Sequence, residues 1–86
     1  MSYKQTAAEV LKYVGGNENV SHLEHCSTRL RFSLNDNSKA NLDQLKKIPG
    51  VMAVKMNAQC QIVIGNEVVE VYNEVKKLLV PNEGDR

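Results

Sequence analysis

The sequence contains little of what several specialised protein classes need. Its 86 residues include two cysteines, one phenylalanine and no tryptophan. Two cysteines are too few for a disulfide scaffold, and a net charge of +1 lacks the basic excess of a dedicated nucleic-acid-binding protein. No apolar run is long enough to span a bilayer, and the N-terminal segment lacks the apolar core of a signal peptide. We therefore expect a soluble, intracellular domain with reduced thiols.

Three segments have the spacing of amphipathic helices. In the first, apolar residues at positions 7, 10, 11 and 14 share one helix face, and Gly15-Gly16 ends the helix. A short second helix is predicted over positions 42–48, with Asn41 as its cap and Pro49-Gly50 as its end. The third carries apolar residues at positions 68, 71, 72, 75 and 78 or 79. Each stripe predicts one helix face that packs on a core.

Four segments have the features of short strands, at residues 20–25, 30–34, 51–56 and 61–64. The second alternates most clearly, with Leu30, Phe32 and Leu34 on one face and Arg29, Arg31 and Ser33 on the other. The order α-β-β-α-β-β-α predicts an α+β fold, a four-stranded antiparallel sheet with three helices on one face. We assign residues 1–80 to this domain, and residues 81–86 to a linker stub or disordered terminus.

The densest group of reactive side chains lies in the connection between the first two predicted strands. Cys26 is a soft nucleophile there, beside the hydroxyl groups of Ser27 and Thr28. Arg29 and Arg31 share one strand face just beyond it, where guanidinium groups stabilise a thiolate and bind an anion. Backbone N–H groups in such a loop also form anion sites. A thiol beside an anion site suits phosphoryl transfer, although a buried structural cysteine and solvated arginines fit the same residues.

The second cysteine and the histidines have plainer interpretations. Cys60 adjoins an apolar run and has no close cationic neighbour in the sequence, so we expect a structural role. A Cys26–Cys60 disulfide fits the sequence, but a reducing compartment argues against it. His22, His25 and the two cysteines match no standard zinc spacing. His25 is instead a candidate for tuning the adjacent thiol.

The cysteine segment resembles the active-site motif of a known family. His25-Cys26-Ser27-Thr28-Arg29-Leu30-Arg31 is similar to the H-C-A-T-R-L-R motif of enzyme IIB domains in bacterial sugar phosphotransferase systems, in the glucose and β-glucoside superfamily. Three further segments resemble that family: Gly15-Gly16 followed by Asn19-Val20, Leu45-Lys46-Lys47-Ile48-Pro49-Gly50-Val51, and Gln61-Ile62-Val63-Ile64-Gly65-Asn66. The chain departs from the family at Ser27, where alanine is common, and at Cys60, where a bulky apolar residue is usual.

The resemblance implies a phosphoryl relay that uses no cofactor and no metal. Cys26 would accept a phosphoryl group from a phosphohistidine on enzyme IIA and pass it to a sugar bound by the membrane enzyme IIC. Thr28 matches a hydroxyl position in the family's loop, and Arg29 and Arg31 match two arginines associated with the onward transfer. Ser27, which departs from the family, adds a second hydroxyl donor that we expect to stabilise the phosphate. The implied location is cytoplasmic, at the inner face of the cell membrane through enzyme IIC. The resemblance implies no nucleic-acid partner and no insertion of this domain into the membrane.

The sugar and the class of function stay open at this point. The match most resembles the β-glucoside branch, with sucrose, trehalose or glucose-type sugars as alternatives for the same relay. A free-standing thiol phosphatase would hydrolyse small phosphoesters without enzyme IIA. A small regulatory or metal-binding module would form no phosphocysteine.

Overall fold

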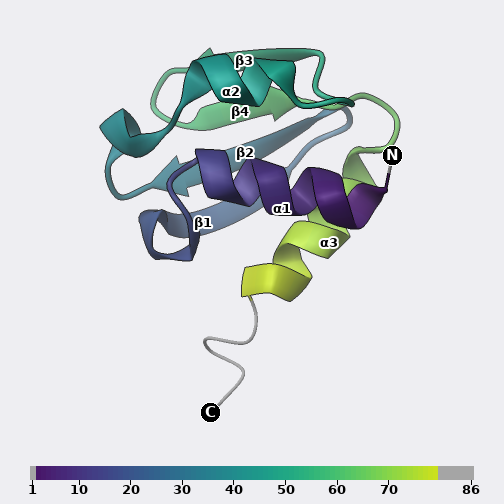
Figure 1. The fold of residues 1–86 in the computed structure, drawn as a ribbon, viewed down its shortest axis with the longest axis horizontal. Helices are drawn as coiled ribbons and strands as arrows, with labels where there is room; N and C mark the ends of the chain where they lie inside the picture. The colour runs from purple at the N-terminus through teal and green to yellow at the C-terminus, as the bar shows by residue number, and fades with distance from the viewer. Residues whose placement is uncertain (1, 80–86) are drawn as a thin grey trace.

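The computed structural model describes residues 2–79, whose three α-helices and four strands follow the predicted order (Figure 1). The helices are α1 (Tyr3–Tyr13), α2 (Leu42–Lys47) and α3 (Val68–Leu79), and the strands are β1 (Val20–His25), β2 (Arg29–Leu34), β3 (Ala53–Met56) and β4 (Cys60–Val63). The predicted α+β class and chain order are therefore confirmed. The predicted linker at 81–86 lies outside the described residues.

The four strands form one antiparallel sheet in the order β1-β2-β4-β3. Figure 1 shows the three helices together in front of this sheet, as predicted. The sheet therefore has one face covered by helices and one open face. Within residues 2–79, no helix has the length and apolarity needed to cross a membrane.

The helix ends follow from local hydrogen bonding. The Ser2 hydroxyl accepts from the N–H of Gln5 at the start of α1. Gly15 follows the end of α1 at a φ of 114°, a left-handed conformation that favours glycine. The Asn41 side chain accepts from the N–H of Gln44, which confirms it as the cap of α2.

The third strand begins later than the sequence pattern predicts. Ala53 is its first residue, although the apolar pattern starts at Val51. The N–H of Val51 donates to the carbonyl of Ile48, and Gly50 has a φ of 99°. This turn keeps Val51 out of the sheet, so the chain joins the strand only after it.

The core lies between the covered face of the sheet and the helices. Leu30 and Phe32 of β2 and Ile62 of β4 are fully buried on that face. The helices contribute buried apolar residues from the predicted stripes, among them Val10, Val14, Leu45, Val71 and Val75. Burial of this apolar surface is the main stabilising term of such a fold. The alternate residues of β2 therefore lie on the open face, and these include both arginines of the motif.

Candidate functional site

Residues 26–28, here called the thiol loop, join β1 to β2 at one end of the sheet. The N–H of Cys26 donates to the carbonyl of Arg29 at 3.0 Å and closes the loop. The Thr28 carbonyl accepts from the N–H groups of Ile64 and Gly65, both at 2.8 Å. Two hydrogen bonds thus anchor the loop to the connection between β4 and α3, while all three of its residues remain exposed.

The thiol loop combines an exposed sulfur with unpaired donors. The Cys26 Sγ lies 3.9 Å from the Arg29 carbonyl oxygen. The N–H and hydroxyl groups of Ser27 and Thr28 have no hydrogen-bond partner among residues 2–79. Free N–H and O–H groups beside a sulfur suit the oxygens of a phosphoryl group bound to it. The structure therefore brings together three of the residues that the sequence analysis selected.

The two arginines lie on the open face of the sheet but do not point into the thiol loop together. The Arg29 Nη1 donates to the Gln61 Oε1 at 2.7 Å. Arg29 itself pairs with Val63 across β2 and β4, whereas Gln61 pairs with Arg31. Because Val63 is nearer to the loop than Gln61, the Arg29 guanidinium extends along the sheet away from Cys26. The Arg31 side chain makes no hydrogen bond or ion pair within the described part of the chain.

His25 contacts the backbone of the next residue. It pairs with Leu30, so its ring lies on the covered face of the sheet, 4.4 Å from the ring of Tyr72 in α3. The His25 Nδ1 lies 3.1 Å from the Cys26 carbonyl oxygen. Because a carbonyl oxygen only accepts, this contact selects the tautomer with its proton on Nδ1. The expected tuning of the thiol by His25 stays a prediction, and the contact that the structure shows is with the Cys26 backbone.

Cys60 lies in the sheet, far from the thiol loop along β2 and β4. It pairs with Phe32 on one side and Met56 on the other, and it is fully buried. Burial raises the pKa of the Cys60 thiol from 9.0 to about 11, so the thiol stays protonated at neutral pH. Within the described residues both cysteines are free, and only Cys26 is exposed. The two cysteines thus differ in exposure, with Cys26 open to solvent and Cys60 in the core.

The four residues considered for zinc do not converge. His22 pairs with Ser33 on the open face, and His25 lies on the covered face. Cys60 is in the core and Cys26 is exposed at the end of the sheet. A tetrahedral zinc site needs its ligands around one point, so this set does not form one.

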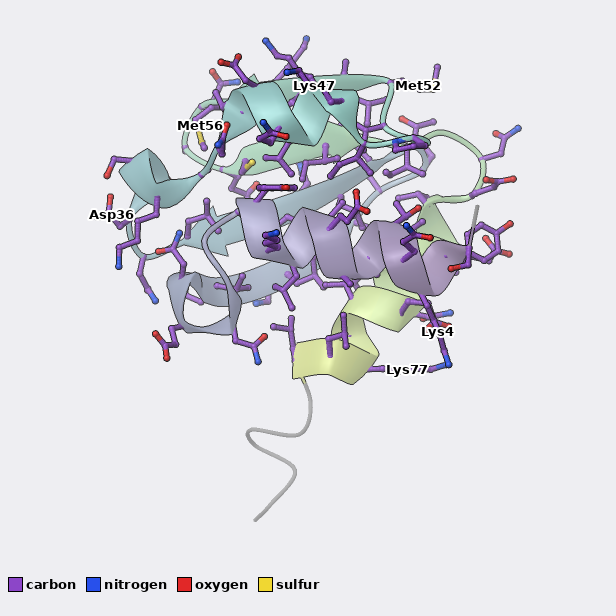
Figure 2. The ribbon with its side chains drawn as sticks, in the orientation of Figure 1. Lys4, Asp36, Lys47, Met52, Met56 and Lys77 are labelled. Atoms are coloured by element: carbon purple, nitrogen blue, oxygen red, sulfur yellow. The ribbon has the colours of Figure 1, made fainter. Side chains whose placement is uncertain are left out.

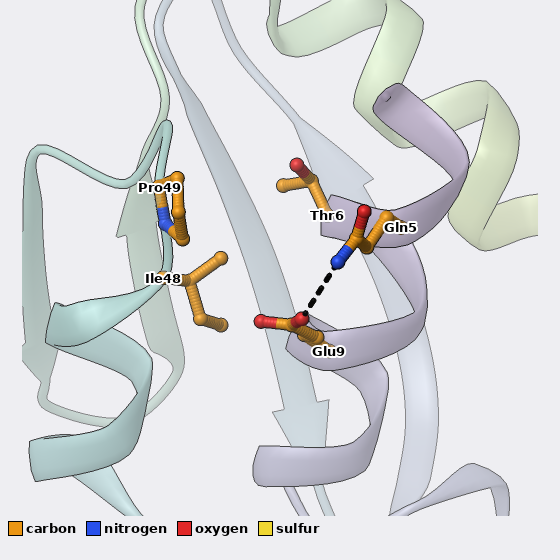
Figure 3. Close-up of a pocket in the computed structure, with 5 residues that line it drawn as sticks. All are labelled: Gln5, Thr6, Glu9, Ile48 and Pro49. Atoms are coloured by element: carbon orange, nitrogen blue, oxygen red, sulfur yellow. Dashed lines mark hydrogen bonds between the residues drawn. The ribbon is translucent and has the colours of Figure 1, made fainter. Parts of the chain in front are cut away.

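Two hollows of the structure lie away from the thiol loop. Figure 3 shows one between α1 and the end of α2, of about 50 Å³ and lined by Gln5, Thr6, Glu9, Ile48 and Pro49. Another is lined by Lys4, Glu74, Lys77 and Leu78, and Figure 2 shows Lys4 and Lys77 ending close together there. Cys26 lines neither of these two hollows, and it is exposed at the end of the sheet.

The chain resembles phosphotransferase-system proteins in sequence and in fold. Residues 8–41 match the family model described as "phosphotransferase system, EIIB". A crystal structure of one domain of the IIabc component from Clostridium difficile is 35% identical, with a TM-score of 0.80 over 88% of this chain and 81% of that one. The chain belongs to the EIIB (enzyme IIB) family of the phosphotransferase system. EIIB domains are phosphotransferases, which gives the class of activity.

Curated relatives place EIIB domains within longer chains. The β-glucoside-specific EIIBCA component of Halalkalibacterium halodurans is 48% identical over 91% of this chain, and that of Bacillus subtilis is 47% identical over 87%. This EIIB chain spans only 12% of the length of either relative. An arbutin-, cellobiose- and salicin-specific EIIBC component of Escherichia coli is 42% identical. In these relatives an EIIB domain shares one chain with an EIIC domain.

Proposed function

We propose that this EIIB domain relays a phosphoryl group during sugar import, with Cys26 as the residue that carries it. The observation that supports the proposal is the exposed Cys26 thiol in an anchored loop with unpaired donors at Ser27 and Thr28. EIIA is the donor and a sugar held by EIIC is the acceptor. In this proposal the domain, residues 1–80, works at the cytoplasmic face of the membrane beside EIIC.

The relay consists of two substitutions at phosphorus. The Cys26 thiol first loses its proton to solvent, and the thiolate attacks the phosphorus of a phosphohistidine on EIIA. An S–P bond forms, the N–P bond breaks, and the histidine nitrogen leaves with the electron pair. A sugar hydroxyl oxygen then attacks the same phosphorus, its proton passes to solvent, and Cys26 leaves as a thiolate. Two partners must reach one sulfur in turn, which an exposed rim allows and a closed cavity does not.

The neighbouring groups serve to hold and neutralise the phosphoryl oxygens. The N–H and hydroxyl groups of Ser27 and Thr28 are placed to donate to them. Arg29 and Arg31 supply positive charge, and a guanidinium offers two parallel donors to a phosphate. His25 acts through the Cys26 carbonyl, which it holds from the covered face of the sheet.

We propose a β-glucoside as the transported sugar. The support comes from relatives named as β-glucoside-specific, at 47–48% identity, whereas a relative named as sucrose-specific is 39% identical. Sugar specificity belongs to the domain that binds the sugar, so the EIIB chain contributes the transfer and not the selection.

Sugar phosphorylation in a reconstituted system tests the proposal. The chain is mixed with phosphoenolpyruvate, enzyme I, the phosphocarrier protein, EIIA, and membrane vesicles that carry a β-glucoside EIIC without its own EIIB domain. We expect salicin phosphate with the wild type, none with Cys26→Ser, and near wild-type rates with the control Cys60→Ala. Equal rates from Cys26→Ser and the wild type would overturn the proposal.

A further inference from the structure

Gln61 lies between two arginines on the open face of the sheet. Its Oε1 accepts a hydrogen bond of 2.7 Å from the Arg29 Nη1, and Arg31 is its direct neighbour across β2 and β4. Gln61 is therefore hydrogen-bonded to Arg29 and lies opposite Arg31 in the sheet. Gln61 entered the sequence analysis only as part of a family-like segment, because its role depends on strand register.

The two arginine side chains differ in their hydrogen bonding. Arg29 has a partner in Gln61, while the Arg31 Nε is buried and has no hydrogen-bond partner within residues 2–79. A buried donor without a partner is costly, so Arg31 gains if the Gln61 oxygen becomes available to it. The Gln61 amide oxygen thus has two candidate donors, the guanidinium groups of Arg29 and Arg31.

The Arg29 backbone borders the thiol loop. Its carbonyl already accepts from the Cys26 N–H, so the two residues face each other across the loop. The Arg29 side chain leaves from this position and extends the other way, toward Gln61. The exchange proposed below requires this side chain to rotate from the Gln61 oxygen toward oxygens on a phosphorylated Cys26.

We propose that Gln61 is a positioning residue that holds Arg29 away from the thiol loop until Cys26 carries a phosphoryl group. Arg29 then leaves Gln61 for the phosphoryl oxygens, and Arg31 takes over the Gln61 oxygen. The exchange is favourable only with phosphate present, because a guanidinium–phosphate pair is stronger than a guanidinium–amide hydrogen bond. This inference rests on the proposed function and adds Gln61 as the residue that controls when Arg29 moves to the phosphoryl group on Cys26.

Two substitutions of Gln61 separate this role from a structural one. Gln61→Glu gives Arg29 a charged partner that competes with the phosphate, so transfer from phosphorylated Cys26 to salicin should slow about tenfold. Gln61→Leu removes the acceptor and releases Arg29, so the same step should stay at or above the wild-type rate. Gln59→Glu is the matched control, because Gln59 donates to Ser33 at the far end of the same face. Its rate should remain at the wild-type level.

The experiment measures phosphorylation of Cys26 by intact mass and then the single-turnover transfer to salicin, for the wild type and each variant. Equal rates for Gln61→Glu and Gln61→Leu, with a wild type that works, would overturn the role of Gln61 and leave the proposed function standing. A wild type that never becomes phosphorylated would overturn both.

Nuclear magnetic resonance of the wild type gives a check that does not depend on any variant folding. The Arg29 guanidinium and Gln61 side-chain amide signals should both shift when Cys26 is phosphorylated. Unchanged signals on phosphorylation would contradict the exchange.

Discussion

Replacement of Asn19 by alanine should be among the most destabilising single changes outside the apolar core. The Asn19 side chain is 3% exposed and makes three hydrogen bonds to backbone groups. Its Nδ2 donates to the carbonyls of Val14 at 2.7 Å and Asp36 at 3.0 Å, and its Oδ1 accepts from the Asp36 N–H at 2.9 Å. The side chain therefore links the end of α1 to the segment that follows β2.

The expected loss follows from the groups that alanine leaves unpaired. At about 1 kcal/mol for each of the three hydrogen bonds, Asn19→Ala should lower the free energy of unfolding by about 3 kcal/mol. For a domain of this size, that corresponds to a fall in Tm of roughly 12–24 °C. Asn19→Asp keeps the volume and the accepting oxygen but loses both donated bonds, so it should also be strongly destabilised.

Urea unfolding followed by circular dichroism measures this loss. Asn17→Ala is the matched control, because the Asn17 Nδ2 makes only a 3.5 Å contact with the Leu78 carbonyl. The Asn17 Oδ1 is buried without a partner among the described residues. Asn17→Ala should therefore change the free energy of unfolding by no more than about 0.5 kcal/mol. An Asn19→Ala midpoint equal to that of the control would refute the reasoning.

Three further outcomes are expected. Gly15→Ala should cost about 2 kcal/mol or more in urea unfolding, because φ is 114° and its Cβ would lie 2.5 Å from the Asn19 Nδ2; an unchanged midpoint would show that the turn can rearrange. Burial raises the pKa of the Cys60 thiol from 9.0 in the unfolded chain to about 11 in the folded one. The free energy of unfolding should therefore fall as pH rises through this window, and more steeply than in Cys60→Ala. Parallel curves for the two proteins would contradict the assigned burial effect. Arg29→Lys should leave phosphorylation of Cys26 intact but slow transfer to the sugar, since lysine lacks the two-donor fork; normal transfer would argue against a role for Arg29.

The sequence alone predicts most of the fold because its signals are local. Alternation in β2, the Asn41 cap and the glycines after α1 each act within a few residues. The boundary of β3 is less predictable, since the turn at Gly50 removes Val51 from the sheet although both positions look apolar and extended.

The thiol loop is predictable for the same reason, but the directions of its neighbours are not. The position of Cys26 between two strands follows from the local pattern, whereas its role as phosphoryl carrier is implied by the resemblance to enzyme IIB domains. The path of Arg29 toward Gln61 depends on the register between β2 and β4, and these strands are distant in sequence. The contact of His25 with Tyr72 similarly depends on how α3 packs across β1. Long-range register and helix packing leave no local pattern to detect.

The central claim, that Cys26 carries the phosphoryl group, is tested most directly by mass spectrometry of the intact chain. The chain is incubated with phosphoenolpyruvate, enzyme I, the phosphocarrier protein and EIIA, with a second EIIB domain as a positive control. We predict the addition of one phosphoryl group, mapped to Cys26 in the peptides, and no addition when EIIA is omitted. A chain that stays unmodified while the control is phosphorylated, or that carries the group on another residue, would contradict the account.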